Sequence, residues 1–344
     1  MPEMLREMLS YCRPSGSATE EQFVKRFIDV HDPLIDEYGN RTLIVGPRDP
    51  RIMFASHFDT VHRRGGRQKV RVNNKGQLIA TSKHSNCLGA DDTTGVYIML
   101  RLIEAEIPGA YIFHFGEEIG CVGAQGIAGY DPFDILPGIE MSLEFDRRGY
   151  HSMVTHQMGS RCASDDFAHA LCDALDMGHK PDDSGIWTDN VEYKTDIPEI
   201  VNISVGYFNQ HSTTETQCPV YVEDLIASLK EVDFDTLPIE RDPTAVDPGE
   251  NYSFRGYGRS RASEDFQDLY DTVCENPDYT AEMLWEYGFE ADDIRKHSRK
   301  ARVRTFPSVE DEDMTDEDIS RAIAEEMSDE AWWNSRFDKE GYAG

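Results

Sequence analysis

Hydrophobic and polar residues follow two different periods between residues 4 and 235. A helical period of about 3.6 predicts amphipathic helices at residues 4–11, 20–30, 93–106, 164–175 and 220–232. Short runs that are apolar nearly throughout predict strands at residues 42–45, 51–56, 110–115, 139–145 and 200–205. Such runs are typical of strands that helices cover on both faces. We therefore predict an α/β fold with a mixed, mostly parallel central sheet sandwiched by helices.

Two local patterns refine this prediction. Residues 69–72 and 78–81 flank the turn residues Asn73-Asn74-Lys75-Gly76, which predicts a β-hairpin. Thr19 stands just before the second predicted helix, and we expect it to be the N-cap.

The pattern changes after residue 235. Proline and glycine are frequent in residues 236–262, which predicts a linker. Further helices are predicted at residues 263–274, 280–287 and 315–327, followed by the pair Trp332-Trp333. We predict a catalytic domain at 1–235, a linker at 236–262 and an acidic helical extension at 263–344. Because tryptophan often anchors interfaces, the extension is a candidate for a protein partner or for self-association.

The charge of the chain narrows its possible partners. Among the 344 residues, 65 Asp and Glu oppose 34 Lys and Arg, giving a net charge of -31. Such a surface repels phosphate backbones and anionic lipids, which argues against nucleic-acid and membrane binding. The sequence has no apolar run of spanning length and no export signal at its start, so we expect a cytoplasmic protein. The seven cysteines form no CxxC pair and are expected to be reduced thiols.

Three segments place potential metal ligands after apolar runs, where open α/β sheets carry their active sites. In His57-Phe58-Asp59, the imidazole could bind a metal while Asp59 accepts a hydrogen bond from the other ring nitrogen, although this pair also fits a core histidine. Asp91 and Asp92 precede a predicted helix, and N-capping would account for one of them. The third segment is Phe115-Gly116-Glu117-Glu118-Ile119-Gly120. One of its glutamates could ligate a metal while the other acts as general base on a metal-bound water.

Two more segments complete the set. Asp146 ends the predicted strand 139–145, and His211 follows the predicted strand 200–205. Together the five segments supply two imidazoles and three carboxylates, which suits a pair of divalent ions such as Zn²⁺, Mn²⁺ or Co²⁺. A shared carboxylate can hold two such ions about 4 Å apart.

These motifs resemble, in order, the signature of the di-zinc exopeptidase clan, which includes leucyl aminopeptidases, peptidase T and the aminoacylase and carboxypeptidase G group. The matching segments are HFD, GADDTTG, FGEEIGCVGA, EFD and QHS, all within residues 4–235. The resemblance implies a zinc exopeptidase-like fold, an enzyme, and two divalent metal ions, Zn²⁺ first. The chain fits the compact branch, because too few residues separate Asp146 from His211 for an inserted lid domain.

The resemblance also implies a role for each site residue. Asp91 would bridge both ions, His57 and Asp146 would bind one of them, and Glu118 and His211 would bind the other. Asp59 would orient His57. Glu117 would be the general base, taking a proton from the bridging water and returning it to the leaving amine. The chain departs from the clan at Thr93, where a lysine or arginine is frequent.

The substrate is left open by the sequence. We expect an aminopeptidase acting on short peptides, with a deacylase or carboxypeptidase-like amidohydrolase acting on an N-acyl small molecule as the alternative. Asp92, Glu144 or Glu215 could hold the free amine that an aminopeptidase recognises. Arg147 or Arg148 could hold the carboxylate that the alternative recognises. A third alternative is a non-catalytic binding or assembly protein on the same fold.

Overall fold

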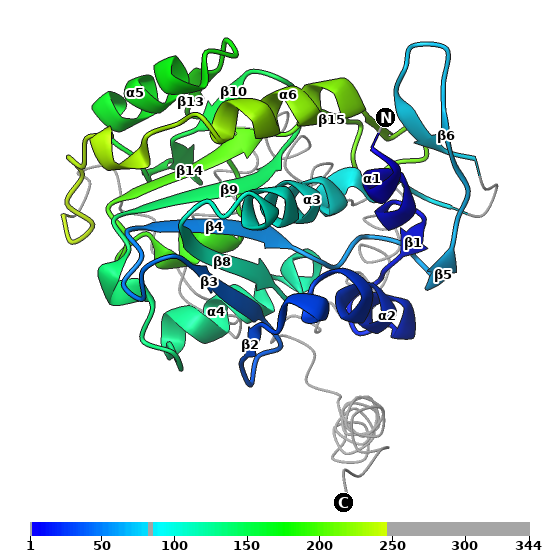
Figure 1. Ribbon diagram of the computed structural model, residues 1–344, viewed down its shortest axis with the longest axis horizontal. Helices are drawn as coiled ribbons and strands as arrows, with labels where there is room; N and C mark the ends of the chain where they lie inside the picture. Colours follow the sequence, from blue (N-terminus) through cyan, green and yellow to red (C-terminus); the bar gives the residue numbers. More distant parts are fainter. Residues whose placement is uncertain (1, 82–84, 246–344) are drawn as a thin grey trace, which may run out of the picture. The chain divides into compact units, whose positions relative to one another are not determined.

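The computed structural model describes residues 2–81 and 85–245, and its centre is an eight-stranded sheet (Figure 1). The strand order is β13-β10-β14-β9-β4-β8-β3-β2. These strands are β2 (Leu34–Ile35), β3 (Arg41–Val45), β4 (Ile52–His57), β8 (Gly109–His114), β9 (Met141–Arg147), β10 (Ser152–Val154), β13 (Lys180–Asp182) and β14 (Glu199–Ser204). The four neighbours β14, β9, β4 and β8 are parallel, whereas β3 runs antiparallel to β8 and β10 antiparallel to β14. The predicted mixed, mostly parallel sheet is confirmed.

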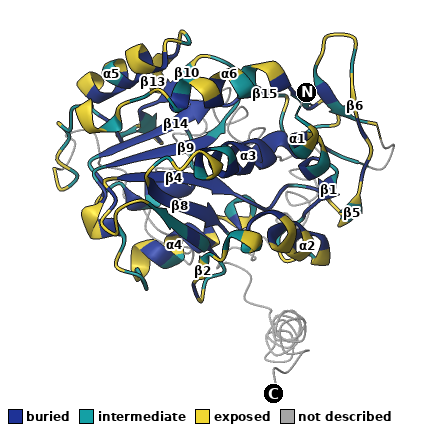
Figure 2. Ribbon diagram, viewed as in Figure 1, coloured by how far each residue is buried: buried dark blue, intermediate teal, exposed yellow. Residues whose placement is uncertain are grey.

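Helices cover both faces of this sheet. One face packs against α1 (Glu3–Met8), α2 (Ala18–Phe27), α3 (Ala90–Glu104), α5 (Asp165–Leu175) and α6 (Pro219–Leu229). The other packs against α4 (Val122–Gly129) and the 3₁₀ turns η3 (Leu136–Gly138) and η4 (Asp189–Tyr193). Figure 2 shows the central strands and α3 as buried. None of the helices in the described ranges is long and apolar enough to cross a membrane.

The alternation of side chains along each strand divides the core into two layers. On β4, Phe54 packs in the α3 layer while Met53 packs in the α4 layer. On β8, Tyr111 and Ile112 divide in the same way. Each fully buried side chain of this size contributes about 1.5–3 kcal/mol of transfer free energy, so both layers hold the sheet between them.

Three small sheets accompany the central sheet in the described residues. The predicted hairpin is confirmed as β6 (Val70–Val72) and β7 (Leu78–Ala80). Strand β7 also pairs with β16 (Thr216–Gln217), which pairs with β15 (Tyr207–Phe208). The four-stranded sheet β15-β16-β7-β6 therefore holds both ends of the loop that carries His211. Separately, β1 (Tyr11–Cys12) pairs with β5 (Gly66–Arg67), and β11 (His156–Gln157) with β12 (Ser160–Arg161).

Two local predictions are wrong, and one helix was not predicted. Ser17, not Thr19, is the N-cap of α2, because the Ser17 hydroxyl accepts the Glu20 N–H at 3.2 Å while Thr19 lies inside the helix. The first predicted helix ends at Met8, since Tyr11 pairs with Arg67 in β1. Helix α4 was not predicted because three of its eight residues are glycine, a poor helix former that only the packing of Ala124 and Ile127 offsets.

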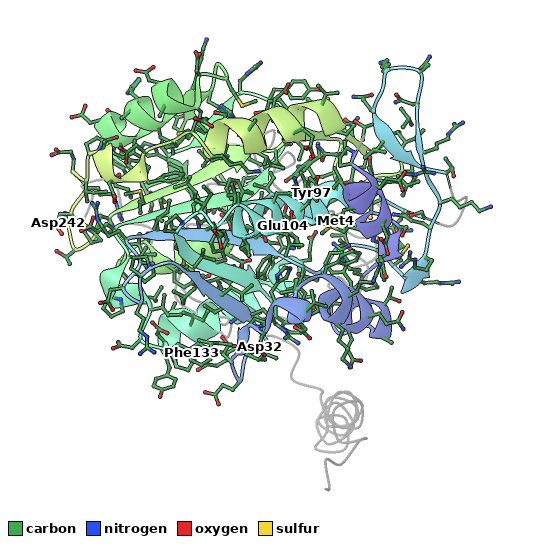
Figure 3. The ribbon with its side chains drawn as sticks, viewed as in Figure 1. Met4, Asp32, Tyr97, Glu104, Phe133 and Asp242 are labelled. Carbon is green, nitrogen blue, oxygen red and sulfur yellow. The ribbon has the colours of Figure 1, made fainter. Side chains whose placement is uncertain are left out.

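Residues 236–245, the first part of the predicted linker, lie along the domain. Leu237 is buried in the α3 layer, and Arg241 donates hydrogen bonds to the carbonyls of four residues, Arg161, Lys194, Ile197 and Pro198. The buried Glu199 carboxylate accepts the backbone N–H groups of residues 240 and 241, both at 2.9 Å. In Figure 3, Asp242 lies on the opposite side of the view from Met4. The rest of the predicted linker, the extension 263–344 and the tryptophan pair lie outside the described residues.

These contacts predict where the domain can be cut. A chain that ends after residue 245 keeps all of these contacts. A chain that ends after residue 235 loses Leu237 and Arg241 and uncovers Glu199, so its free energy of unfolding should fall by about 3–5 kcal/mol. Urea unfolding of both truncated chains measures this difference, and equal stability would show that residues 236–245 do not belong to the domain.

Candidate metal centre

The sheet brings the predicted ligands together at the carboxyl ends of its parallel strands. His57 is the last residue of β4 and lies opposite His114 of β8. Asp146 lies near the end of β9, the neighbour of β4 on its other side. The pairing of β14 with β9 shifts register between Glu144 and Arg147, so the regular alternation of β9 is broken at the end that carries Asp146.

His57, Asp91 and Asp146 form the first of three groups of potential ligands in the described residues. The Nε2 atom of His57 lies 3.2 Å from Asp91 Oδ1 and 3.9 Å from Asp146 Oδ2. Its Nδ1 atom lies 3.3 Å from Asp59 Oδ1, on the other side of the ring. Asp59 is fully buried, so it fixes the ring with Nε2 facing the two carboxylates.

Asp91, Glu118 and His211 form the second group. The Nε2 atom of His211 lies 3.1 Å from Asp91 Oδ2 and 3.2 Å from Glu118 Oε1. Asp91 thus presents one carboxylate oxygen to each histidine. The five residues that the sequence predicted as ligands are therefore brought together, with Asp91 shared between the two groups.

Glu117 and Glu118 form the third group with His57. The Oε2 atom of Glu117 is 3.9 Å from His57 Nε2, and the Glu117 backbone N–H donates to Asp59 Oδ1 at 3.2 Å. Both glutamates belong to the 3₁₀ turn η2 (Glu117–Ile119), which begins directly after Gly116, a residue with φ +71°. That left-handed residue turns the chain sharply at the end of β8 and directs the two carboxylates toward the strand ends.

The donor set fits two divalent cations. The buried atoms His211 Nε2 and Glu118 Oε1 lie 3.2 Å apart, yet neither has a hydrogen-bond partner. Polar atoms that converge in this way without pairing fit a cation at their common point better than they fit each other. Imidazole nitrogens with carboxylate oxygens are a ligand mixture that suits Zn²⁺, Mn²⁺ or Co²⁺.

The electrostatics of the cluster also favour positive charge. Burial raises the pKa of Glu117, Glu118 and Asp146, since each carboxylate is taken out of water beside other acids. Burial alone would lower the pKa of both histidines. The neighbouring carboxylates of Asp59 and Asp91 nevertheless hold the pKa of His57 above its usual range, and the negative charges of Glu118 and Asp91 do the same for His211. Protons therefore compete with metal ions for this cluster.

Glu215 holds the loop that presents Asp91. Its carboxylate is buried and accepts four consecutive backbone N–H groups, those of residues 88 to 91, at 2.6–3.2 Å. Asp92 accepts the Gly95 N–H at 2.8 Å inside the first turn of α3. Asp92 therefore serves the start of the helix and also accepts the His57 backbone N–H at 3.4 Å, while Asp91 presents its oxygens to the two imidazole rings.

Three further residues position the site and were not predicted from the sequence. Tyr207 donates its hydroxyl to Asp146 Oδ1 at 2.8 Å, which leaves Oδ2 facing His57. Asn202 binds the backbone N–H and carbonyl of Asp146. The buried Arg13 donates to Thr93 Oγ1 at 2.8 Å. The guanidinium of Arg13 thus contacts residue 93, the position where the clan often has a lysine or arginine.

A cavity of about 310 Å³ opens over the two groups. Four of the acids described above line it, namely Asp91, Glu117, Glu118 and Asp146. Arg147, Arg148, Trp187, Thr188 and Gln210 are also among its lining residues. A cavity of this volume is large enough for a small ligand.

The Glu215 contacts predict a variant that disturbs the site from a distance. Glu215→Ala removes the acceptor of four buried N–H groups, so the free energy of unfolding should fall by about 3 kcal/mol and metal affinity should fall with it. Chemical unfolding and metal titration measure the two effects. The matched control is Glu223→Ala, which removes a carboxylate that accepts the Tyr97 hydroxyl away from the site. Unchanged metal affinity in Glu215→Ala would show that the hydrogen bonds to the Glu215 carboxylate do not position Asp91.

Comparison with solved structures identifies the fold. An aminopeptidase, PepT, from Bacillus cereus superposes with a TM-score of 0.53 and 17% identity, over 66% of this chain and 95% of that one. A tripeptidase from Staphylococcus aureus gives a TM-score of 0.52 and 15% identity, over 67% and 95%. A TET aminopeptidase from a marine sediment Thaumarchaeota archaeon gives 0.50 and 14%, also over 67% and 95%. No protein-family model and no curated protein sequence matches the chain. The described part of the chain thus has the fold of these peptidases.

Proposed function

We propose that this protein is a di-metal exopeptidase that cleaves short peptides, with an aminopeptidase as its leading form. One observation carries the proposal: the Asp91 carboxylate lies between His57 and His211 and offers one oxygen to each. The fold supports it, because the similar structures include two aminopeptidases and a tripeptidase. The cavity volume of about 310 Å³ also suits a short peptide better than a folded substrate.

The proposed ligands are those that the sequence predicted. His57 and Asp146 would hold one divalent ion, Glu118 and His211 the other, and Asp91 both. When bound, the two ions would make a water molecule more acidic and polarise the carbonyl of the scissile bond. Zn²⁺ is the first choice for this donor set, with Mn²⁺ and Co²⁺ as alternatives.

Glu117 is the proposed general base. Its carboxylate lies at the cavity within 3.9 Å of His57 Nε2, and its backbone N–H is anchored to Asp59. Burial raises its pKa, which makes the carboxyl group a better proton acceptor than an exposed glutamate. Glu117 would accept a proton from the attacking water and then donate that proton to the nitrogen of the leaving amine. The carboxylate is regenerated, so the proton balance of hydrolysis closes.

A second function, hydrolysis of an N-acylated small molecule, is favoured by the cations of the cavity. Arg147 and Arg148 line the cavity, as an enzyme that recognises a carboxylate requires. Both functions use the same ligands and the same base, and they differ only in the group recognised beside the scissile bond.

The base assignment predicts a separation of binding from turnover. Glu117→Gln should keep two bound ions per chain, whereas kcat should fall by about 10²- to 10⁴-fold, because the amide cannot accept the proton. Metal analysis and peptide hydrolysis measure the two effects. Glu140→Gln is the control, since that carboxylate is 42% exposed and paired with Arg51. Full activity in Glu117→Gln would show that Glu117 is not the general base.

The metal assignment predicts a pH dependence. Metal binding must displace protons from His57 and His211, whose pKa values are raised in the protein, so affinity should rise with increasing pH. Calorimetry in two buffers of different ionisation enthalpy measures the protons released.

A chelator should abolish hydrolysis, and added Zn²⁺, Mn²⁺ or Co²⁺ should restore it. His211→Gln should weaken binding, whereas His169→Gln, at an exposed residue of α5, should not. Hydrolysis by the stripped protein would contradict the proposal.

A further inference from the structure

We propose that a basic groove along strand β6 binds an acidic segment of a partner protein in an extended conformation. The basic groove is a second cavity, and five cations line it, namely Arg6, Arg26, Arg67, Lys69 and Arg71. In the part of the chain that the structure describes, this cavity shares no lining residue with the cavity over the proposed metal centre. The inference therefore does not depend on the proposed function.

Three of these cations come from a segment whose composition is unlike that of the rest of the chain. Residues 60–90 contain seven Lys and Arg and no Asp or Glu, whereas the whole chain has 65 Asp and Glu against 34 Lys and Arg. The segment includes β5 and the hairpin with β6, and in Figure 1 this hairpin projects from the same side of the domain as α1. A positive surface on a protein of net charge -31 attracts anions that the rest of the molecule repels.

The groove gathers positive charge from several elements. Its volume is about 940 Å³, and its lining comes from α1, the end of α2, β5 and β6. Arg6 belongs to α1 and Arg26 to α2, so the cations meet through the tertiary structure. Against the five cations, the described lining includes two acids, Glu3 and Glu7. The groove therefore has an excess of three positive charges.

The protein itself engages some of these cations. Arg26 pairs with Glu7 Oε1 at 2.9 Å. The guanidinium of Arg67 lies over the Tyr11 ring, 3.5 Å from its centroid, which fixes its position but leaves its charge uncompensated by an acid.

Lys69 and Arg71 are the cations that remain available. Both are exposed, and within the described residues neither side chain forms an ion pair or a hydrogen bond. Charge at the edge of a sheet can serve to prevent strands of other molecules from pairing there, and β6 is the edge strand of the sheet β15-β16-β7-β6. That role would account for Lys69 and Arg71 alone. It does not account for Arg6 and Arg26, which lie on helices and line the same groove.

Strand β6 also offers main-chain groups to the groove. The Lys69 carbonyl accepts the Thr81 N–H at 2.9 Å on the side of β7. Because backbone groups alternate along a strand, Val70 directs its N–H and carbonyl to the opposite side. The Val70 carbonyl accordingly accepts Arg6 Nε at 3.2 Å. An extended segment along this edge can pair with the strand while its acidic side chains reach the cations.

These features favour a polypeptide over a nucleic acid. A nucleic acid carries a charge at every phosphate and would continue from the groove onto a surface that repels it. An excess of three positive charges instead suits a short segment with a few acids. Met4 and Phe27 also line the groove, and they can contact the uncharged side chains of such a segment.

The test measures the binding of short peptides to the full chain. The probe is a peptide of alternating Glu and Thr, acetylated and amidated at its ends, and the control peptide has Gln in place of Glu. By calorimetry at low salt, the acidic peptide should bind about tenfold or more tightly than the control peptide, and added salt should reduce the difference. Mass spectrometry checks that both peptides stay intact. Equal affinities at low salt would overturn the proposal.

Substitutions at exposed cations locate the binding site. Lys69→Gln should weaken binding of the acidic peptide about threefold, and Lys69→Gln combined with Arg71→Gln about tenfold. Lys75→Gln is the matched control, because it removes the same charge from an exposed residue of the same hairpin that does not line the groove. An equal loss in Lys69→Gln and Lys75→Gln would show unspecific attraction and overturn the proposal. Urea unfolding checks that the variants keep the stability of the unsubstituted chain.

Two further measurements test the kind of partner and the mode of binding. A single-stranded oligothymidine of the same length should bind more weakly than the acidic peptide, and tighter binding would overturn the proposal in favour of a nucleic acid. In hydrogen exchange, the acidic peptide should slow exchange of the Val70 and Val72 N–H groups, and unchanged exchange there would show that the peptide does not pair with β6. None of these measurements uses turnover, so they remain valid even if the proposed function fails.

Discussion

The site depends on one physical constraint: several buried carboxylates lie so close together that they require positive charge between them. Asp91 contacts both His57 and His211, and Glu117, Glu118 and Asp146 complete the cluster within a few ångström. Carboxylates removed from water are costly unless they are paired or coordinate a metal. Protons on the two histidines can supply this charge, and so can divalent ions, which is why the same residues imply both a metal site and a pH-dependent affinity.

The rest of the fold serves to hold this cluster in place. The parallel strands β4, β8 and β9 are neighbours in the sheet. Their carboxyl ends carry His57, the turn with Glu117 and Glu118, and Asp146. Glu215 gathers four N–H groups of the loop that carries Asp91, and the β7 and β16 pairing fixes the loop that carries His211. The site thus joins segments far apart in the sequence, each fixed by contacts outside the cluster.

Much of the fold and the set of clustered residues could be predicted because both leave local signals. Apolar runs indicate the buried strands, and an acid or a histidine at the end of such a run stands out. The groups that surround a carboxylate in the folded protein leave no such signal in the local sequence. Glu215 and Glu144 read as possible amine anchors in the sequence, yet backbone N–H groups and the Thr188 hydroxyl engage them. Arg13 donates a hydrogen bond to Thr93, which is 80 residues away in the sequence, so only the tertiary structure brings the two together. Helix α4 was not predicted, because its glycines interrupt the helical pattern of apolar residues.

The most direct measurement of the central claim is anomalous diffraction at the zinc absorption edge from crystals of the full chain loaded with Zn²⁺. The account predicts two anomalous peaks about 4 Å apart, on either side of the Asp91 carboxylate, one against His57 and Asp146 and the other against Glu118 and His211. Peaks at other residues, or no peak at Asp91, would contradict it.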